Sequence, residues 1–230
     1  MRVTILQDAA EPFNVSVHNA GEHSTVVLFA VGAGGQPARH STLLDSLVSA
    51  GYSVIAPHFA RLLSPHPTEQ ELTQRARRLC LAVDAFSQPE AKVLGVGHSI
   101  GATMLVALAG GQMWLGPGRK VAIAGQHRLK RLALLAPATG FFQAPGALDA
   151  VSLPMLVWVG ASDNITPPQR CSWFADVMSG STSVDFRITE HAGHFSFMDQ
   201  VPPNTTEPLT NKQEFLRQYS SEVCNFLSQA

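Results

Sequence analysis

Charged residues are scarce in this chain, at 14% of its 230 residues. The 16 lysines and arginines nearly balance the 17 aspartates and glutamates, and no basic run occurs. Binding to nucleic acid needs a basic face that neutralises phosphates, so we expect no nucleic-acid partner. With 45% hydrophobic residues, the composition also excludes a disordered chain and a charged coiled coil.

Cysteine is equally scarce. Cys80, Cys171 and Cys224 are odd in number, far apart and without a CxxC pair, which predicts free thiols in a reducing compartment. No apolar run approaches the roughly 18 residues that cross a bilayer, and residues 1–8 lack the apolar segment of a signal peptide. We therefore expect a cytoplasmic protein with no membrane partner.

Stretches typical of strands alternate with stretches typical of helices. This alternation predicts an α/β fold with a mostly parallel sheet between helices, and the length fits one domain, residues 1–230. Residues 13–18 alternate as an edge strand would, with 1–6 as a hairpin partner, and 183–188 alternate as the far edge. Buried strands are predicted at residues 25–30, 52–57, 92–97, 132–135 and 155–159.

Four helices are predicted between the strands. Thr68 and Glu71 form a capping-box pattern before the first, and Thr210 and Gln213 form another before the last. The second helix follows Gly101, and the third opens near Pro167 or Pro168. The segments 111–130 and 139–153 show no clear pattern, and neither is long enough for a separate cap domain. The irregular segment 200–210 is expected either at the edge of a functional site or as a surface loop.

The strongest chemical signal is the G-x-S-x-G pattern at residues 97–101. It follows a predicted buried strand and precedes a predicted apolar helix, the context that a nucleophile elbow requires. A sharp turn of this kind exposes the serine hydroxyl and needs small residues on both sides. Ser99 is therefore a candidate nucleophile, and the alternative is a glycine-rich turn around an ordinary serine.

Together with the alternating strands and helices, this pattern resembles the α/β-hydrolase superfamily over essentially the whole chain. In that family an acid and then a histidine follow the nucleophile along the chain. Asp163, which comes after a predicted strand in Gly160-Ala161-Ser162-Asp163, matches the position of the acid. An Asx turn or helix cap is the alternative role, and Asp176 and Asp185 are worse placed, inside a predicted helix and a predicted strand.

His194 matches the histidine of the family, because glycine precedes it and an aromatic residue follows it. Its neighbour His191 is the rival. An imidazole suits this role because its pKa lies near working pH, so it can take the serine proton and return it to a leaving group. The resemblance implies that Asp163 orients this ring and stabilises its charged form.

The resemblance also implies an oxyanion hole made of two backbone N–H groups, those of Ile100 and Ala33. Residues 31–35 resemble the H-G-x-G-G loop of the family, with Val31 in place of its histidine, so the usual bracing of the loop is missing. The same glycines fit neither the spacing of a P-loop nor that of a dinucleotide-binding turn.

For the substrate pocket we expect His98, Phe141 and Phe195, with an apolar lining overall. His58, His66, Trp114, Phe142, Trp173 and Phe197 are further candidates, most of them more typical of core or surface. The nine histidines are scattered without ligand spacing, so no metal and no cofactor is expected.

These features predict a serine hydrolase with a minimal cap that cleaves a small to medium carboxylic ester or lactone, as a monomer or homodimer. Dienelactone hydrolases proper use cysteine as nucleophile, so Ser99 favours the carboxylesterase side of the resemblance. A thioesterase, a peptidase, a cofactor-free lyase or haloperoxidase, and a ligand-binding protein on a hydrolase scaffold remain alternatives, because a fold alone does not separate them.

Overall fold

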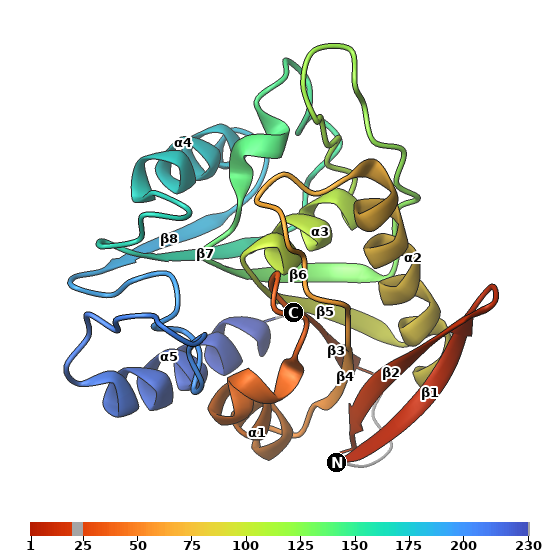
Figure 1. Ribbon diagram of the computed structural model, residues 1–230, viewed down its shortest axis with the longest axis horizontal. Coiled ribbons are helices and arrows are strands. Elements are labelled where there is room, and N and C mark those ends of the chain that lie inside the picture. Colours follow the sequence, from red (N-terminus) through yellow and green to blue (C-terminus); the bar gives the residue numbers. More distant parts are fainter. Residues whose placement is uncertain (20–24, 230) are drawn as a thin grey trace.

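The computed structural model describes residues 1–19 and 25–229, which are built around an eight-stranded sheet (Figure 1). The strand order is β1-β2-β4-β3-β5-β6-β7-β8; β3 to β8 run parallel, and β1 and β2 form an antiparallel hairpin beside β4. The predicted α/β class is confirmed. The strands are β1 (Arg2–Asp8), β2 (Glu11–His18), β3 (Thr25–Ala30), β4 (Ser53–Pro57), β5 (Lys92–His98), β6 (Leu129–Leu135), β7 (Met155–Gly160) and β8 (Val184–Thr189).

Helices cover both faces of this sheet. Figure 1 shows α1 and α5 packed together on one side and α2, α3 and α4 on the other, so the central strands are enclosed. The helices are α1 (Ser41–Ser49), α2 (Glu69–Phe86), α3 (Ile100–Leu108), α4 (Pro168–Ser179) and α5 (Lys212–Leu227), with short 3-10 helices at Pro37–His40 and Thr139–Phe142.

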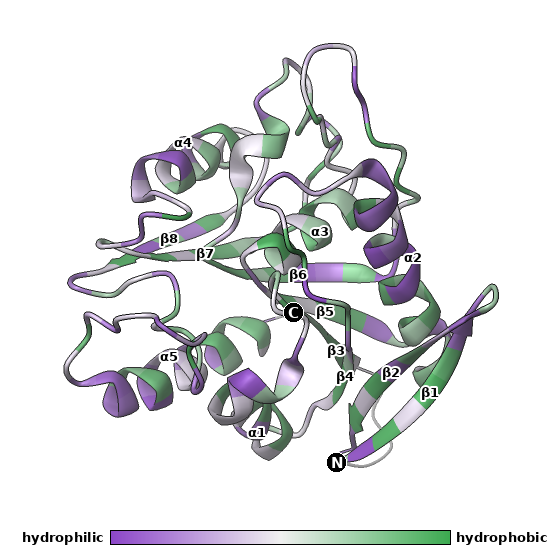
Figure 2. Cartoon of the chain, in the orientation of Figure 1, coloured by the Kyte–Doolittle hydropathy of each residue, from purple (hydrophilic) through white to green (hydrophobic). Residues whose placement is uncertain are grey.

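The central strands are apolar because both of their faces are covered. Figure 2 shows hydrophobic residues along β3, β5, β6 and β7, while α2 and α5 carry hydrophilic residues on their outer sides. The described part of the chain contains no helix that is both long and apolar enough to cross a membrane. Cys80, Cys171 and Cys224 are free, as predicted.

Three details differ from the predictions. Residues 13–18 do form a strand, but β1 pairs outside it, so β1 rather than β2 is the edge. Helix α1 was not predicted, because residues 41–49 carry only a short apolar stripe. The capping box at Thr210 and Gln213 is wrong: α5 starts after Asn211, whose side chain makes no capping hydrogen bond within the described chain. The box at Thr68 and Glu71 is confirmed.

The turn from β5 into α3 depends on a close approach between two backbones. A Cβ at Gly101 would overlap the carbonyl oxygen of Ala30 and lie 2.6 Å from that of Val31, both at the end of β3. A Cβ at Gly97 would lie 2.7 Å from the backbone nitrogen of Ala102. Only glycine fits at these two positions, and α3 can therefore start directly against the sheet.

Replacing Gly101 by alanine should lower the free energy of unfolding by about 3 kcal/mol or more, because the added methyl group meets backbone that cannot move aside. Gly34→Ala is the matched control, since nothing lies within 4 Å of a Cβ there, and its effect should stay within about 0.5 kcal/mol. Urea unfolding measures both values. Equal stability of the two variants would contradict the close approach.

The edge hairpin is held to α2 by a buried carboxylate. Asp8 is 3% exposed and forms ion pairs with Arg77 and with Arg78, whose Nε lies 3.0 Å from Asp8 Oδ2. The hydrogen bond from Arg77 is the main reason that the pKa of Asp8 lies below its ordinary value; burial opposes it, and Arg78 lowers the pKa further. The folded state therefore favours the ionised carboxylate.

Asp8→Asn should lower the free energy of unfolding by about 2 kcal/mol at pH 7, because Arg77 and Arg78 lose a charged partner. A lowered pKa in the folded state means that this stabilisation is present above the ordinary carboxyl pKa and is lost as pH falls through the folded value. The gap between wild type and variant should thus close below about pH 4. Denaturant unfolding from pH 7 to pH 3 checks this, with the exposed Asp176→Asn as control; a gap independent of pH would contradict it.

Candidate active site

Ser99 lies at the carboxyl end of β5, directly before α3. Its backbone has φ 57° and ψ −127°, a conformation that is rare for any residue except glycine. The N–H of Ser99 donates a hydrogen bond of 2.9 Å to the carbonyl of Leu135 at the end of β6, which holds the strained turn. The predicted sharp elbow is thus present, at the edge of the sheet where the parallel strands end.

His194, from the loop after β8, contacts Ser99, and Asp163, from the loop after β7, contacts His194. His194 Nε2 lies 3.0 Å from Ser99 Oγ, and His194 Nδ1 lies 2.8 Å from Asp163 Oδ2. All three residues are at most 9% exposed. The arrangement fits a neutral imidazole that donates from Nδ1 to the carboxylate and accepts the serine hydroxyl at Nε2.

Asp163 makes hydrogen bonds both within its own turn and to His194. Its Oδ1 accepts hydrogen bonds from the backbone N–H groups of Ile165 and Thr166, at 2.8 and 2.7 Å, so it shapes the turn before α4. Its Oδ2 faces His194 and the hydroxyl of Thr166. Burial tends to raise the pKa of Asp163, but the hydrogen bonds from His194 and Thr166 outweigh it, and the pKa lies below its ordinary value.

His98 lies behind His194. Its Nε2 donates a hydrogen bond of 2.9 Å to the backbone carbonyl of His194, and the two ring centroids are 4.9 Å apart. Burial, together with the nearby His194 and His40, lowers the pKa of His98 well below its ordinary value. Burial likewise lowers the pKa of His40 to about 4. Both rings are therefore neutral at pH 7, and His98 supports the loop that carries His194.

The two amides expected to form an oxyanion hole border the same cavity as Ser99. Within residues 1–19 and 25–229, neither Ala33 nor Ile100 donates a backbone hydrogen bond to another group. The N–H of Ile100 is free because it opens α3, where no preceding helical turn offers an acceptor.

Buried Arg75, on α2, braces the loop that carries Ala33. Its guanidinium donates to the carbonyl of Gly32 at 3.3 Å and to that of Ala60 at 3.1 Å. Because C=O and N–H point in opposite directions across a trans peptide, fixing the Gly32 carbonyl also fixes the N–H of Ala33. Burial lowers the pKa of Arg75 to about 10. Arg75 thus braces the loop in which Val31 stands in place of the histidine of the H-G-x-G-G pattern.

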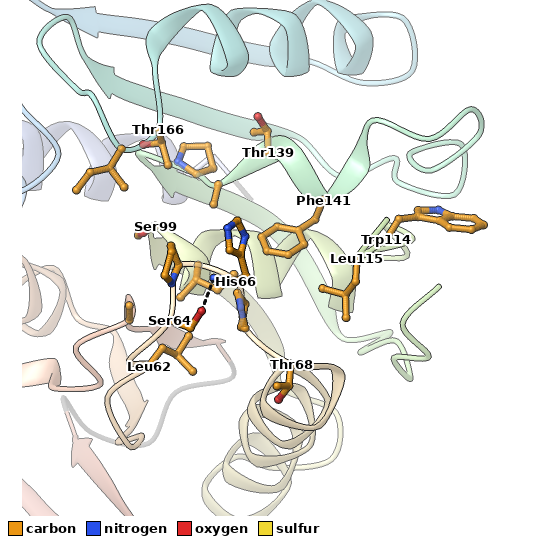
Figure 3. A pocket seen from close by; sticks show the side chains of 18 of the residues that line it. Leu62, Ser64, His66, Thr68, Ser99, Trp114, Leu115, Thr139, Phe141 and Thr166 are labelled. Carbon is orange, nitrogen blue, oxygen red and sulfur yellow. Dashed lines mark hydrogen bonds between the residues drawn. The ribbon is translucent and has the colours of Figure 1, made fainter. Parts of the chain in front are cut away.

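The larger cavity has a volume of about 610 Å³, within the range of small-molecule sites. Its walls come from the loops between β4 and α2, between α3 and β6, and between β6 and β7. Figure 3 shows Ser99 at one end, Trp114 and Leu115 at the other, and Phe141 between them. Segment 111–130, unassigned from the sequence, therefore forms part of the site through residues 114–119.

A smaller cavity of about 140 Å³ also borders Ser99. His194 and Phe195 line this cavity and not the larger one, together with Arg39 and Met198. Pro202 brings the segment 200–210 to the same wall. Ser99 thus lines both a large and a small cavity.

Of the predicted pocket residues, Phe141 lines the large cavity, and His98 and Phe195 line the small one. His66 and Trp114 also reach the large cavity, whereas Phe142 and Phe197 are buried core and Trp173 lies on α4 away from both cavities. His58 bonds to Ser16 and lines neither cavity.

The rival candidates for the triad lie away from Ser99. His191 and Asp176 are exposed, and Asp185 pairs with Arg187.

Sequence reasoning missed four residues of the site: Thr166, Arg75, Arg119 and Arg170. Arg119 and Arg170 both line the large cavity, which is therefore less apolar than expected. Thr166 follows Asp163 by three residues, a spacing at which a hydroxyl can reach the carboxylate, and that signal was available. Arg119 comes from a segment without a clear pattern, and Arg75 and Arg170 come from helices, where nothing local marks them.

Comparisons with known proteins agree at the level of the fold. No protein-family model matches the sequence, and no curated protein matches it. Among solved structures, a candidate α/β hydrolase of unknown function from Agrobacterium tumefaciens superposes with a TM-score of 0.68 at 13% identity, covering 99% of this chain and 97% of that one.

Two similar structures are described as esterases. The butyrate-bound esterase 2 of Thermogutta terrifontis has a TM-score of 0.67 at 15% identity, with 99% of this chain and 93% of that chain covered. A carboxylesterase of Lactobacillus plantarum has a TM-score of 0.65 at 15% identity, with 100% and 98% covered. At these identities the likeness concerns architecture, and it agrees with the strand order and the elbow described above. The chain has the α/β-hydrolase fold.

Proposed function

We propose that this protein is a serine hydrolase that cleaves carboxylic esters through an acyl-serine intermediate. The observation that carries the proposal is the chain of contacts from Ser99 Oγ to His194 Nε2 at 3.0 Å and from His194 Nδ1 to Asp163 Oδ2 at 2.8 Å. Beside it lie a strained serine backbone and two free amides at a cavity. These are the parts that nucleophilic acyl transfer needs.

In the first half of the reaction, Ser99 Oγ attacks the carbonyl carbon while its proton passes to His194 Nε2. The carbonyl oxygen gains negative charge and accepts hydrogen bonds from the N–H groups of Ala33 and Ile100. The tetrahedral intermediate then collapses, the bond to the alcohol oxygen breaks, and His194 gives its proton to that oxygen. Asp163 stays ionised throughout and stabilises the imidazolium, consistent with its lowered pKa.

In the second half, a water molecule attacks the acyl-serine while His194 Nε2 takes a proton from it. Collapse of the second intermediate breaks the bond to Ser99 Oγ, which recovers its proton from His194 and releases the carboxylic acid. The walls of the large cavity include Leu62, Trp114, Leu115 and Phe141, which suit an acyl chain. Ester is also the bond named in the descriptions of the Thermogutta and Lactobacillus proteins that share this fold.

Replacing Ser99 by alanine or His194 by alanine should lower ester hydrolysis by about 10,000-fold. Asp163→Asn should lower it by about 1,000-fold or more, because asparagine keeps the Oδ1 acceptor of the turn but no longer stabilises an imidazolium. Initial rates with p-nitrophenyl butyrate measure these losses. His191→Ala is the matched control: it lies in the same loop as His194, is exposed, and should leave the rate unchanged.

A fluorophosphonate probe tests the nucleophile without knowledge of the natural substrate, since it requires only an activated serine and an oxyanion hole. Mass spectrometry should locate the adduct on Ser99 alone, with no adduct in Ser99→Ala. A folded wild-type protein that neither reacts with the probe nor hydrolyses esters would overturn the proposal and favour a ligand-binding protein on the same scaffold.

Arg75→Lys should slow labelling by the probe about 10-fold, because an ammonium cannot bond to the carbonyls of Gly32 and Ala60 in the forked geometry of a guanidinium. The loss should appear in kcat rather than KM for p-nitrophenyl butyrate, since the oxyanion exists only in the transition state. Arg217→Lys, at an exposed position on α5, is the control. An unchanged kcat in a stable Arg75→Lys variant would show that the brace is dispensable.

A further inference from the structure

Arginine is concentrated around Ser99 although the protein as a whole is not basic. The net charge of the chain is −1, yet Arg119 and Arg170 line the large cavity and Arg39 lines the small one. Among the described residues that line either cavity there is no aspartate or glutamate. Among the lysine, arginine, aspartate and glutamate side chains of the described residues, only arginines line the two cavities.

The two arginines of the large cavity have no acidic partner. Neither Arg119 nor Arg170 takes part in an ion pair within residues 1–19 and 25–229, and neither side chain donates a hydrogen bond there. By contrast, Arg77, Arg78 and Arg187, which lie away from the cavities, all pair with carboxylates. Unpaired guanidinium groups at a cavity are available to bind an anion bidentately.

The backbones that carry these two side chains are fixed. Arg119 closes a tight turn in which its carbonyl accepts from Leu115 at 2.9 Å and its N–H donates to Gly116 at 3.0 Å. Arg170 stands in the first turn of α4, and its carbonyl accepts from the hydroxyl of Thr139 at 3.1 Å. Its Nη1 lies over Gly140, in the wall that also includes Phe141.

The position of His194 decides which half of the substrate enters which cavity. The leaving oxygen must come within hydrogen-bond reach of His194 Nε2, and His194 lines only the small cavity. A volume of about 140 Å³ suits an alcohol of a few carbons. The acyl half then extends into the large cavity, toward Arg119 and Arg170.

We infer that the preferred substrates are half-esters of dicarboxylic acids, in which a small alcohol occupies the small cavity and Arg119 and Arg170 bind the free carboxylate at the far end of the acyl chain. This inference rests on the proposed serine-hydrolase function. It also separates the protein from a carboxypeptidase, in which the free carboxylate belongs to the leaving half and would lie on the side of His194.

The test compares monoethyl glutarate, adipate, suberate and sebacate with the ethyl esters of the neutral fatty acids of equal chain length, with kcat/KM measured for each. Wild type should prefer the half-ester by about 10-fold or more at one chain length, since hydrogen bonds to a charged group are strong. The preference should weaken as salt is raised from 20 to 500 mM. Equal kcat/KM values for the two series would overturn the inference.

In the double variant Arg119→Gln/Arg170→Gln, the ratio of kcat/KM for the half-ester to kcat/KM for the neutral ester should fall to about one. Arg217→Gln on α5 should leave this ratio unchanged. Fluorophosphonate labelling of Ser99 and thermal unfolding show whether each variant is folded and reactive. Loss of the preference in Arg39→Gln but not in the double variant would put the carboxylate on the alcohol side and overturn the assignment. If wild type cleaves neutral esters and half-esters equally well, the half-ester inference is wrong but the hydrolase function is retained. If wild type is neither labelled nor able to cleave esters, both the hydrolase function and the half-ester inference are wrong.

Discussion

The site depends on the close approach of Gly101 to the end of β3. Because no Cβ stands between them, α3 starts directly against the carbonyls of Ala30 and Val31, and Ser99 is left in a strained turn at φ 57°. The same approach brings the first free N–H of α3 beside the loop that carries Ala33. One backbone contact therefore places both the hydroxyl and the two amides, and a methyl group at residue 101 would separate them all.

Buried polar groups fix the loops that carry Ala33, Asp163 and His194 around this turn. Arg75 fixes the peptide of Ala33 from behind, His98 holds the loop of His194 by its backbone carbonyl, and Asp163 anchors its own turn with one carboxylate oxygen. Burial keeps His98 neutral and lowers the pKa of Arg75 to about 10, at which it remains charged near neutral pH. None of these groups lines the larger cavity, yet they hold in place the loops whose side chains make the contacts of 3.0 and 2.8 Å along the proposed triad.

The sequence allowed the strands, most helices and the proposed triad to be predicted, because each has a local signature. Ser99 lies in a five-residue pattern, Asp163 follows a strand with a continuous apolar run, and His194 follows a strand with alternating apolar residues. The capping box at Thr210 failed because the start of a helix depends on tertiary packing as well as on local sequence; α5, which packs on α1, starts only at Lys212. Arg119 and Arg170 could not be predicted as site residues, because they line a cavity whose walls come from loops far apart in the chain. Their lack of acidic partners can be recognised only in three dimensions.

The distribution of charge links the architecture to selectivity. Away from the two cavities, several arginines are paired with carboxylates, as at Asp8 and Asp185. The described residues that line the two cavities include arginine but no aspartate or glutamate, and Asp163, behind His194, has both oxygens occupied by hydrogen bonds from His194, Thr166 and Ile165. The negative charge that the proposed chemistry requires is thus kept away from the cavity, and the positive charge faces it. A substrate with its own carboxylate would neutralise the positive charge of these arginines, whereas an uncharged ester would not.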